Sequence, residues 1–176
     1  YQPDGLWAIA MGNPAYAQSH GPDLYRRSLY TYWKKTVPPP AMMTLDAADR
    51  SYCTVRRQST NTPLQSLVLL NDPQFVEASR VLAERMLKEG GTTTADRLVW
   101  LFRAGTSRRP TEREIGILTA SFEEQREIFA ADLDGAKKVV GVGEKKADES
   151  LDAVELAAGT VIAQEILNHD EAVRRR

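Results

Sequence analysis

The chain has 176 residues, of which 42% are hydrophobic and 27% charged, and its formal net charge at pH 7 is −1. These values are typical of a globular protein that can bury its own core, and they do not indicate a disordered chain. No apolar run reaches the roughly eighteen residues of a membrane-spanning helix, and the near-zero charge argues against a nucleic-acid partner. We therefore expect neither a membrane span nor nucleic-acid binding.

The start of the chain and its single cysteine narrow the possibilities further. The sequence begins Tyr1-Gln2-Pro3, without a methionine and without a signal-peptide pattern. We therefore expect one domain spanning 1–176, as the C-terminal fragment of a larger protein. Cys53 is the only cysteine, which rules out an intrachain disulfide or a two-cysteine haem attachment within this chain. We interpret it as a buried, unreactive thiol.

Residues 1–62 are expected to be loop-rich, because proline, glycine, asparagine and serine recur through them. One helix is predicted near residues 24–36, where aromatic and apolar side chains share one face at helical spacing in DLYRRSLYTYWKKT. Asp23 would be its N-cap. Three successive prolines then end the helix, because none can donate a backbone hydrogen bond. Residues 41–62 are expected to be irregular or extended.

Residues 63–176 show helical periodicity and predict a helical bundle. Thr62 can cap a first helix with Pro63 at its first position. Asp72 followed by proline begins a second helix, which two glycines end after residue 89. Thr111 and Glu114 have the spacing of a capping box at the start of a long helix.

The later helices complete the predicted fold. They are expected at about 94–104, 111–131, 134–141 and 151–168. Strand signals are scarce. The sequence therefore predicts an all-α fold, an irregular bundle of about five to six helices with a loop-rich, proline-containing N-terminal third.

A basic and aromatic zone lies between Tyr25 and Arg57. It holds seven arginine or lysine residues and five aromatic residues, against only Asp46 and Asp49. One interpretation is a site for a carboxylate, sulfate or phosphate, because arginine forks bind such anions. The other is that the arginines pair with aspartates and fasten the irregular third to the bundle. The candidate residues for binding an anion or a partner are Arg26, Arg27, Trp33, Arg56, Arg57 and Asn61.

Motifs for catalysis or metal binding are missing from the sequence. His20 and His169 lie far apart, and neither has a histidine or cysteine partner three or four residues away, so no metal site is predicted. There is no Gly-x-Ser-x-Gly motif and no phosphate-binding lysine loop. No catalytic residue is assigned. We interpret this domain alone as a binding unit and leave an enzymatic role open.

One known family resembles most of the chain. Its hallmark segment is similar to DLYRRSLYTYWKKTVPPPAMMTLDAADRSYCTVRRQSTNTPLQSLVLLNDPQFVEA, and its borders are similar to YQPDGLW and ELAAGTVIAQEILNHDEAV. This family is a planctomycete-type domain of unknown function that closes large exported proteins. Those proteins carry a cytochrome-c-like domain and a second uncharacterised domain upstream. The chain departs from the family at Gly159 and His169, where larger apolar residues are expected.

The resemblance implies an exported, periplasmic protein with no cofactor in this chain and haem in an upstream domain of the parent protein. The family often accompanies sulfatases and other enzymes that degrade polysaccharides. Two hypotheses follow from it. In the first, the chain is a non-catalytic helical interaction module that docks on upstream domains of the same polypeptide through its basic and aromatic zone. In the second, it is part of a composite enzyme or binding site for anionic or sulfated carbohydrate, coupled to electron transfer.

Overall fold

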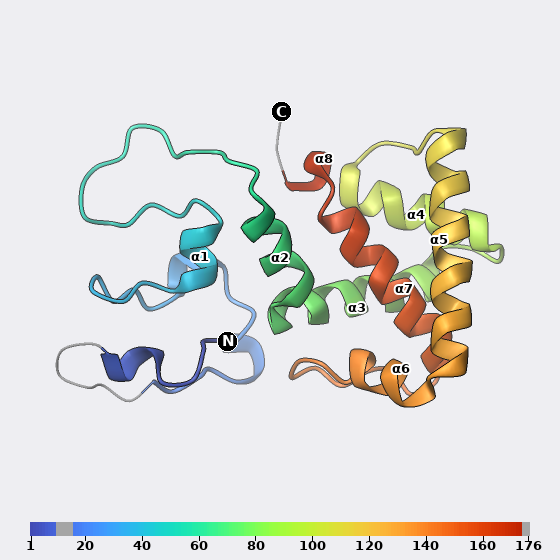
Figure 1. Cartoon of the computed structure of the whole chain (residues 1–176), viewed down its shortest axis with the longest axis horizontal. Coiled ribbons are helices and arrows are strands. Elements are labelled where there is room, and N and C mark those ends of the chain that lie inside the picture. The colour runs from blue at the N-terminus through green and yellow to red at the C-terminus, as the bar shows by residue number, and fades with distance from the viewer. Residues whose placement is uncertain (10–15, 174–176) are drawn as a thin grey trace. The chain divides into compact units, whose positions relative to one another are not determined.

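The computed structural model describes residues 1–9 and 16–173 of the chain (Figure 1). Every regular element among these residues is a helix, so the predicted all-α fold is confirmed. The chain divides into two compact units, Tyr1–Val68 and Leu69–Arg176. This boundary lies close to the expected change from a loop-rich part to a helical part, at residues 62 and 63. The prediction that residues 1–176 form one domain stays a prediction.

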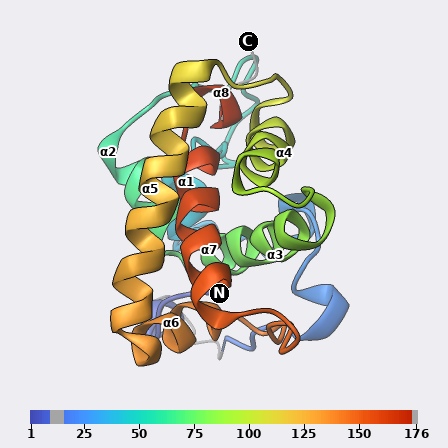
Figure 2. The same cartoon turned by 90° about the vertical axis from the view of Figure 1, so that its right-hand side faces the viewer.

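The second unit is a helical bundle built around one central helix. Its helices are α3 (Pro73–Glu89), α4 (Thr94–Thr106), α5 (Glu112–Ala131), α6 (Leu133–Val140), α7 (Ala153–Leu167) and α8 (Asp170–Val173). Helix α7 packs against all five of the others, and Figure 2 shows it running between α5 on one side and α3 and α4 on the other. The centre of the bundle therefore belongs to the last long helix of the chain.

The core of this bundle consists of apolar side chains from α3, α4, α5 and α7. Its buried members are Met86, Leu98, Leu101, Phe102, Leu118, Phe122, Ala158, Ile162, Ala163 and Ile166. Small residues let α7 approach α3 closely. A Cβ atom at Gly159 would lie 2.9 Å from Cε of Met86 and 3.2 Å from Cβ of Ala83. Gly159, where the family pattern has a larger residue, therefore fits the close packing of α7 against α3.

Local sequence signals set where the helices begin. The Asp72 side chain accepts a hydrogen bond from the backbone N–H of Gln74, as expected of an N-cap before proline. Thr111 and Glu114 form the predicted capping box at the start of α5. Helix α3 has the predicted bounds, because Gly90 follows its last turn. The helical half of the prediction is confirmed.

The first unit is loop-rich and has its own small aromatic core. Its elements are the short 3-10 helices Leu6–Ile9, Gly21–Asp23 and Ser28–Tyr30, the short helix α1 (Pro40–Thr44), and the start of α2 (Pro63–Asn71). The ring of Trp7 is buried and stacks with Tyr16 at a centroid distance of 5.6 Å. Tyr32 packs against the same ring at 5.3 Å. These aromatic contacts bring together parts of the chain that share no regular element.

The predicted helix near residues 24–36 is wrong. The chain there has one short 3-10 helix and is otherwise irregular, with the extended conformation at Thr31. A continuous helix would have placed Tyr32 and Trp33 on one face. Instead Tyr32 packs on Trp7, and Trp33 donates its indole N–H to Asp49. Aromatic and β-branched residues have modest helix propensity, so these distant contacts decide the backbone.

Candidate functional site

All six predicted site residues lie in the first unit. We call residues 23–62 the basic-aromatic segment, which leads from the second 3-10 helix to the start of α2. Between α1 and α2 the chain makes a wide excursion without regular structure (Figure 1). The site must therefore be built from the contacts that hold this excursion in place and from the side chains that it leaves exposed.

The carboxylate of Asp46 closes the base of this excursion. It accepts hydrogen bonds from the backbone N–H of Thr60 at 2.7 Å and from the side-chain amide of Gln65 at 3.1 Å. The hydrogen bond from the Thr60 N–H is the main cause that lowers the pKa of the Asp46 carboxyl. Gln65 is buried and forms a capping box with Thr62, each side-chain oxygen accepting from the backbone N–H of the other. The base of the loop is thus fixed to the first turn of α2.

Trp33 supports the same loop from the side. Its indole N–H donates to the carbonyl oxygen of Asp49 at 3.1 Å. The guanidinium of Arg50 lies 4.8 Å from the centre of the Trp33 ring, a cation–π contact that contributes about 0.5–1 kcal/mol at an exposed position. Arg50 has a backbone φ of +61°, which is uncommon for a residue with a long side chain. Trp33 is partly buried, and its contacts with Asp49 and Arg50 help to fix the loop.

The four predicted arginines are not brought together into one site. Arg26 pairs with Asp23 at 2.6 Å, in an ion pair whose two side chains are both largely exposed. Arg57 donates from Nε to the carbonyl oxygen of Asp46 at 3.2 Å. Arg27 and Arg56 are exposed. Arg57 therefore helps to hold the loop. Arg26 pairs with Asp23, which the sequence had indicated as a helix N-cap and not as the partner of an arginine.

Exposed apolar side chains accompany these arginines. Tyr25, Leu29, Tyr30 and Tyr32 are exposed, Leu29 by 73%. Asn61 is also exposed, directly before the start of α2. The thiol of Cys53 is exposed, so its expected burial is wrong. The segment thus presents aromatic and cationic groups together, the composition that is enriched at the centres of protein interfaces.

A second group of charged residues, on α3, was missed by the sequence interpretation. Glu77 is 3% exposed, and its carboxylate accepts hydrogen bonds from the backbone N–H groups of Glu144 and Lys145 at 3.0 and 3.1 Å. Gly143, just before them, has a φ of +96°. Successive N–H groups that converge in this way form a nest for an anion, which here is the side chain of Glu77.

The same face of α3 continues this contact for about three more turns. Arg80 is fully buried, pairs with Glu84 and donates to the carbonyl oxygen of Lys145. Glu84 accepts from the backbone N–H of Asp148 at 3.3 Å, and Lys88 pairs with the Asp148 carboxylate. We call Glu77, Arg80, Glu84 and Lys88 the α3 charge row. The only sign of this row in the sequence is the spacing of its charged residues by three and four positions. Charged residues on the solvated face of a helix have the same spacing, so the sequence does not distinguish the two.

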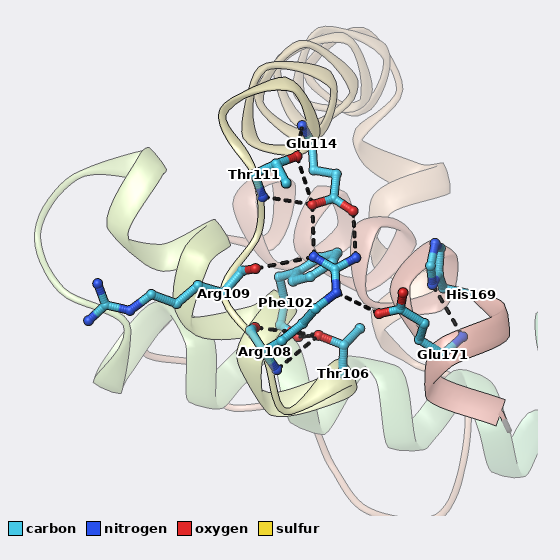
Figure 3. A network of polar contacts seen from close by, with 8 residues as sticks. All are labelled: Phe102, Thr106, Arg108, Arg109, Thr111, Glu114, His169 and Glu171. Carbon is cyan, nitrogen blue, oxygen red and sulfur yellow. Dashed lines mark hydrogen bonds and ion pairs between the residues drawn. The ribbon is translucent and has the colours of Figure 1, made fainter. Parts of the chain in front are cut away.

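The guanidinium of Arg108 is the centre of another network in the second unit (Figure 3). It binds both carboxylate oxygens of Glu114 on α5, at 2.6 and 2.9 Å, and one oxygen of Glu171 on α8 at 2.6 Å. It also lies 4.7 Å over the ring of Phe102. Hydrogen bonds from Arg108 lower the pKa values of both glutamates and raise its own. This network joins α4, α5 and α8.

Both networks of the second unit serve the fold. Apart from Nε of Arg80, which is buried without a hydrogen-bond partner among the described residues, the charged groups of the α3 charge row and of the Arg108 network contact partners within the unit. No group of three or more histidine, cysteine, aspartate or glutamate side chains among the described residues could hold a metal ion. Across residues 1–9 and 16–173, none of the helices has both the length and the apolar character to cross a membrane. The basic-aromatic segment therefore remains the candidate site for binding.

The fold and the site together define the class of the protein: it is all-helical and has an exposed basic-aromatic segment. The family model for PSD1, described as a protein of unknown function (DUF1553), matches residues 1–122. The chain therefore belongs to this family. No curated protein and no solved structure matches it. The matched part contains the whole first unit and ends at Phe122, inside α5.

Proposed function

We propose that this chain is a non-catalytic interaction module that docks on neighbouring domains of its parent polypeptide. The observation that carries the proposal is the exposure of Tyr25, Leu29, Tyr30 and Tyr32 beside two arginines. Aromatic side chains and arginine supply most of the binding energy in protein interfaces, because they bury much area at a small cost in conformational entropy. The family resemblance supports a parent protein that is exported and carries haem in another domain.

The surrounding structure suits this role, because it holds the segment in one conformation before binding. Tyr32 packs against the buried ring of Trp7, and the next residue, Trp33, donates its indole N–H to the carbonyl oxygen of Asp49. A preorganised surface loses little conformational freedom on association. We call residues 24–32 the docking face. It is held at its C-terminal end by Tyr32 and by the neighbouring Trp33, and the side chains of Tyr25, Leu29 and Tyr30 before that end are exposed.

The test is association of the 176-residue chain with the remainder of its parent polypeptide, measured by calorimetry. We expect Tyr30→Asp to weaken binding about tenfold or more, because it places a carboxylate in the apolar centre of the interface. The matched control is Ile117→Asp, a similarly exposed position on α5, which should leave the affinity unchanged. The proposal fails if no association occurs at high micromolar concentration, or if both variants weaken it equally.

The carbohydrate hypothesis gives a different result in a second measurement. A sulfated oligosaccharide that binds the arginines would raise the melting temperature of the chain, since a ligand that binds only the folded state stabilises it. Arg56→Gln would remove this shift, because it removes a cation that binds the anion. Tyr30→Asp would only reduce the shift, because it adds repulsion but removes no cation. A clear shift, together with no association with the parent polypeptide, would replace domain docking by the composite site for anionic carbohydrate.

A further inference from the structure

The end of the loop between α1 and α2 is a separate surface with its own pattern. We call residues 50–59 the tip. All ten of its side chains are exposed, and none of them is acidic. Two apolar residues lie in its middle, with Tyr52 exposed by 72% and Val55 fully exposed. Arg50 precedes them in the chain, and Arg56 and Arg57 follow. The tip thus presents an apolar centre between arginines.

The base of the tip is closed by contacts with neighbouring parts of the first unit. Asp46 binds Thr60 across the base, and Arg57 donates to the carbonyl oxygen of Asp46. Arg50 stacks on Trp33 at the other end. A loop whose ends are joined in this way has already lost part of the conformational entropy that binding would cost. The contacts at the base therefore restrict a loop whose apolar side chains, Tyr52 and Val55, are exposed.

We propose that the tip binds the surface of an anionic lipid membrane. The positive charge of the three arginines attracts the negative headgroups, and the exposed guanidinium of Arg56 can bind a phosphate directly, whereas Arg50 and Arg57 also hold the base of the loop. Val55 enters the boundary between headgroups and acyl chains, where burial of its side chain is favourable. Tyr52 suits the headgroup level, because its ring is apolar and its hydroxyl remains hydrated. The arginine side chains extend their charges back to the phosphates.

Charge and exposure together favour a lipid surface over other partners. A sulfated polysaccharide would bind Arg50 and Arg56 but would leave Val55 in water, so it gives no reason for a fully exposed valine between cations. A docking protein domain would bind the tip whether or not anionic lipid is present, so the experiment below distinguishes it from a lipid surface. The docking face, residues 24–32, is not part of this contact. Membrane binding by the tip and domain docking by that face therefore stand or fall separately.

The experiment is co-sedimentation of the full chain with lipid vesicles. We compare vesicles of phosphatidylcholine alone with vesicles that also contain phosphatidylglycerol, at low and at high salt. The chain should sediment with the anionic vesicles only, and less at high salt because screening weakens contacts between exposed charges. Val55→Asp should reduce the partition coefficient about tenfold. Arg56→Gln should reduce it about fivefold, the equivalent of one cationic residue at an anionic surface.

Two control variants lie in the second unit and match these changes. Ile117→Asp places a carboxylate at another exposed apolar position, and Arg109→Gln removes an exposed arginine whose side chain points away from the Arg108 network (Figure 3). Both should bind vesicles like the unaltered chain. All four positions are exposed, so circular dichroism should show the same helical content in each variant.

Three results would overturn the proposal. The first is no binding to anionic vesicles at low salt. The second is binding that Val55→Asp leaves intact, since this would be simple attraction between charges without insertion. The third is binding of a sulfated oligosaccharide that is lost in Arg56→Gln and kept in Val55→Asp, together with no effect of Val55→Asp on vesicles. That combination would identify the tip as a polysaccharide site.

Discussion

Replacing Gly143 by alanine should unfold the second unit far more easily than its position in a surface loop suggests. Gly143 has a φ of +96°, where an L-residue with a Cβ is strained by about 1–2 kcal/mol. A Cβ there would lie 2.6 Å from Cγ of Glu77 and would also overlap its carboxylate. The Glu77 side chain must then move away from the backbone N–H groups of Glu144 and Lys145. Its carboxylate now accepts hydrogen bonds from these two groups at 3.0 and 3.1 Å.

The magnitude follows from these two effects. Hydrogen bonds to a charged group contribute about 1.5–3 kcal/mol each, and a shifted carboxylate that stays buried keeps only part of them. Adding the strain, we expect Gly143→Ala to lower the free energy of unfolding by about 3–5 kcal/mol. With a denaturant slope of about 2 kcal/mol/M for a unit of this size, the urea midpoint should fall by about 2 M.

The assay is urea unfolding followed by far-UV circular dichroism, which reports mainly the helices of the second unit. The matched control is Gly116→Ala in the second turn of α5, where a Cβ would meet nothing within 4 Å. The same chemical change should stabilise the protein there by about 0.5–1 kcal/mol, because alanine favours the helix.

A double-mutant cycle tests the reasoning itself. In a Glu77→Ala background the overlap with the side chain is gone, so Gly143→Ala should cost only the backbone strain of about 1–2 kcal/mol. An equal loss in both backgrounds would refute the proposed contact between Gly143 and the Glu77 carboxylate. A loss no larger than that of an ordinary surface substitution in the unaltered background would refute the anion nest as a stabilising feature.

Three further predictions concern acid, truncation and the loop base. Because folded-state pKa values of Glu114 and Glu171 lie below the ordinary value of 4.5, their contribution to stability is present above about pH 4.5 and is lost as the pH falls toward the folded values. Arg108→Gln should therefore flatten the acid side of a plot of urea midpoint against pH, and parallel plots would contradict this. A chain ending at Phe122, where the family match ends, lacks all of α7 and should show no cooperative thermal transition. Asp46→Asn should speed hydrogen exchange across the tip by lowering the cost of local opening by about 1 kcal/mol, whereas Asp23→Asn should leave exchange there unchanged.

The helical part of the fold could be predicted from the sequence because its signals are local. Asp72 with a following proline, and Thr111 with Glu114, set the start of two helices within four residues of chain. The buried core residues Met86 and Phe122 also fit the helical spacing of these stretches. Signals of this kind do not depend on what the rest of the chain does, so single-sequence reasoning reads them well.

Contacts between distant residues explain what the sequence could not show. Tyr32 and Trp33 fit a helical pattern, but their partners Trp7 and Asp49 hold the chain in another conformation. Glu77 meets the Glu144 N–H, 67 residues away, so its burial leaves no trace in the local pattern. In the candidate site, the zone of arginines was evident from composition. An arginine fixes the loop where it donates to a main-chain oxygen, as Arg57 does to Asp46. The positions of such oxygens depend on the folded backbone, so no sequence pattern reveals them.

The missed capping box at α2 is a different case. Thr62 and Gln65 have the spacing of this motif, so the sequence did contain a signal for the fixed base of the loop. Gln65 also reaches Asp46, and this second bond makes a local helix start part of a tertiary contact. A glutamine three residues after a capping threonine can thus mark the place where a long loop returns to the fold.

The closed base of the tip also has an evolutionary consequence. Because Asp46, Thr60 and Gln65 hold the loop at its base, substitutions at the exposed positions Tyr52 and Val55 leave these contacts in place. Natural variation can therefore exchange these two apolar residues while the rest of the protein keeps its stability. The same property makes this loop a suitable place to insert a peptide or to graft a binding sequence in protein engineering.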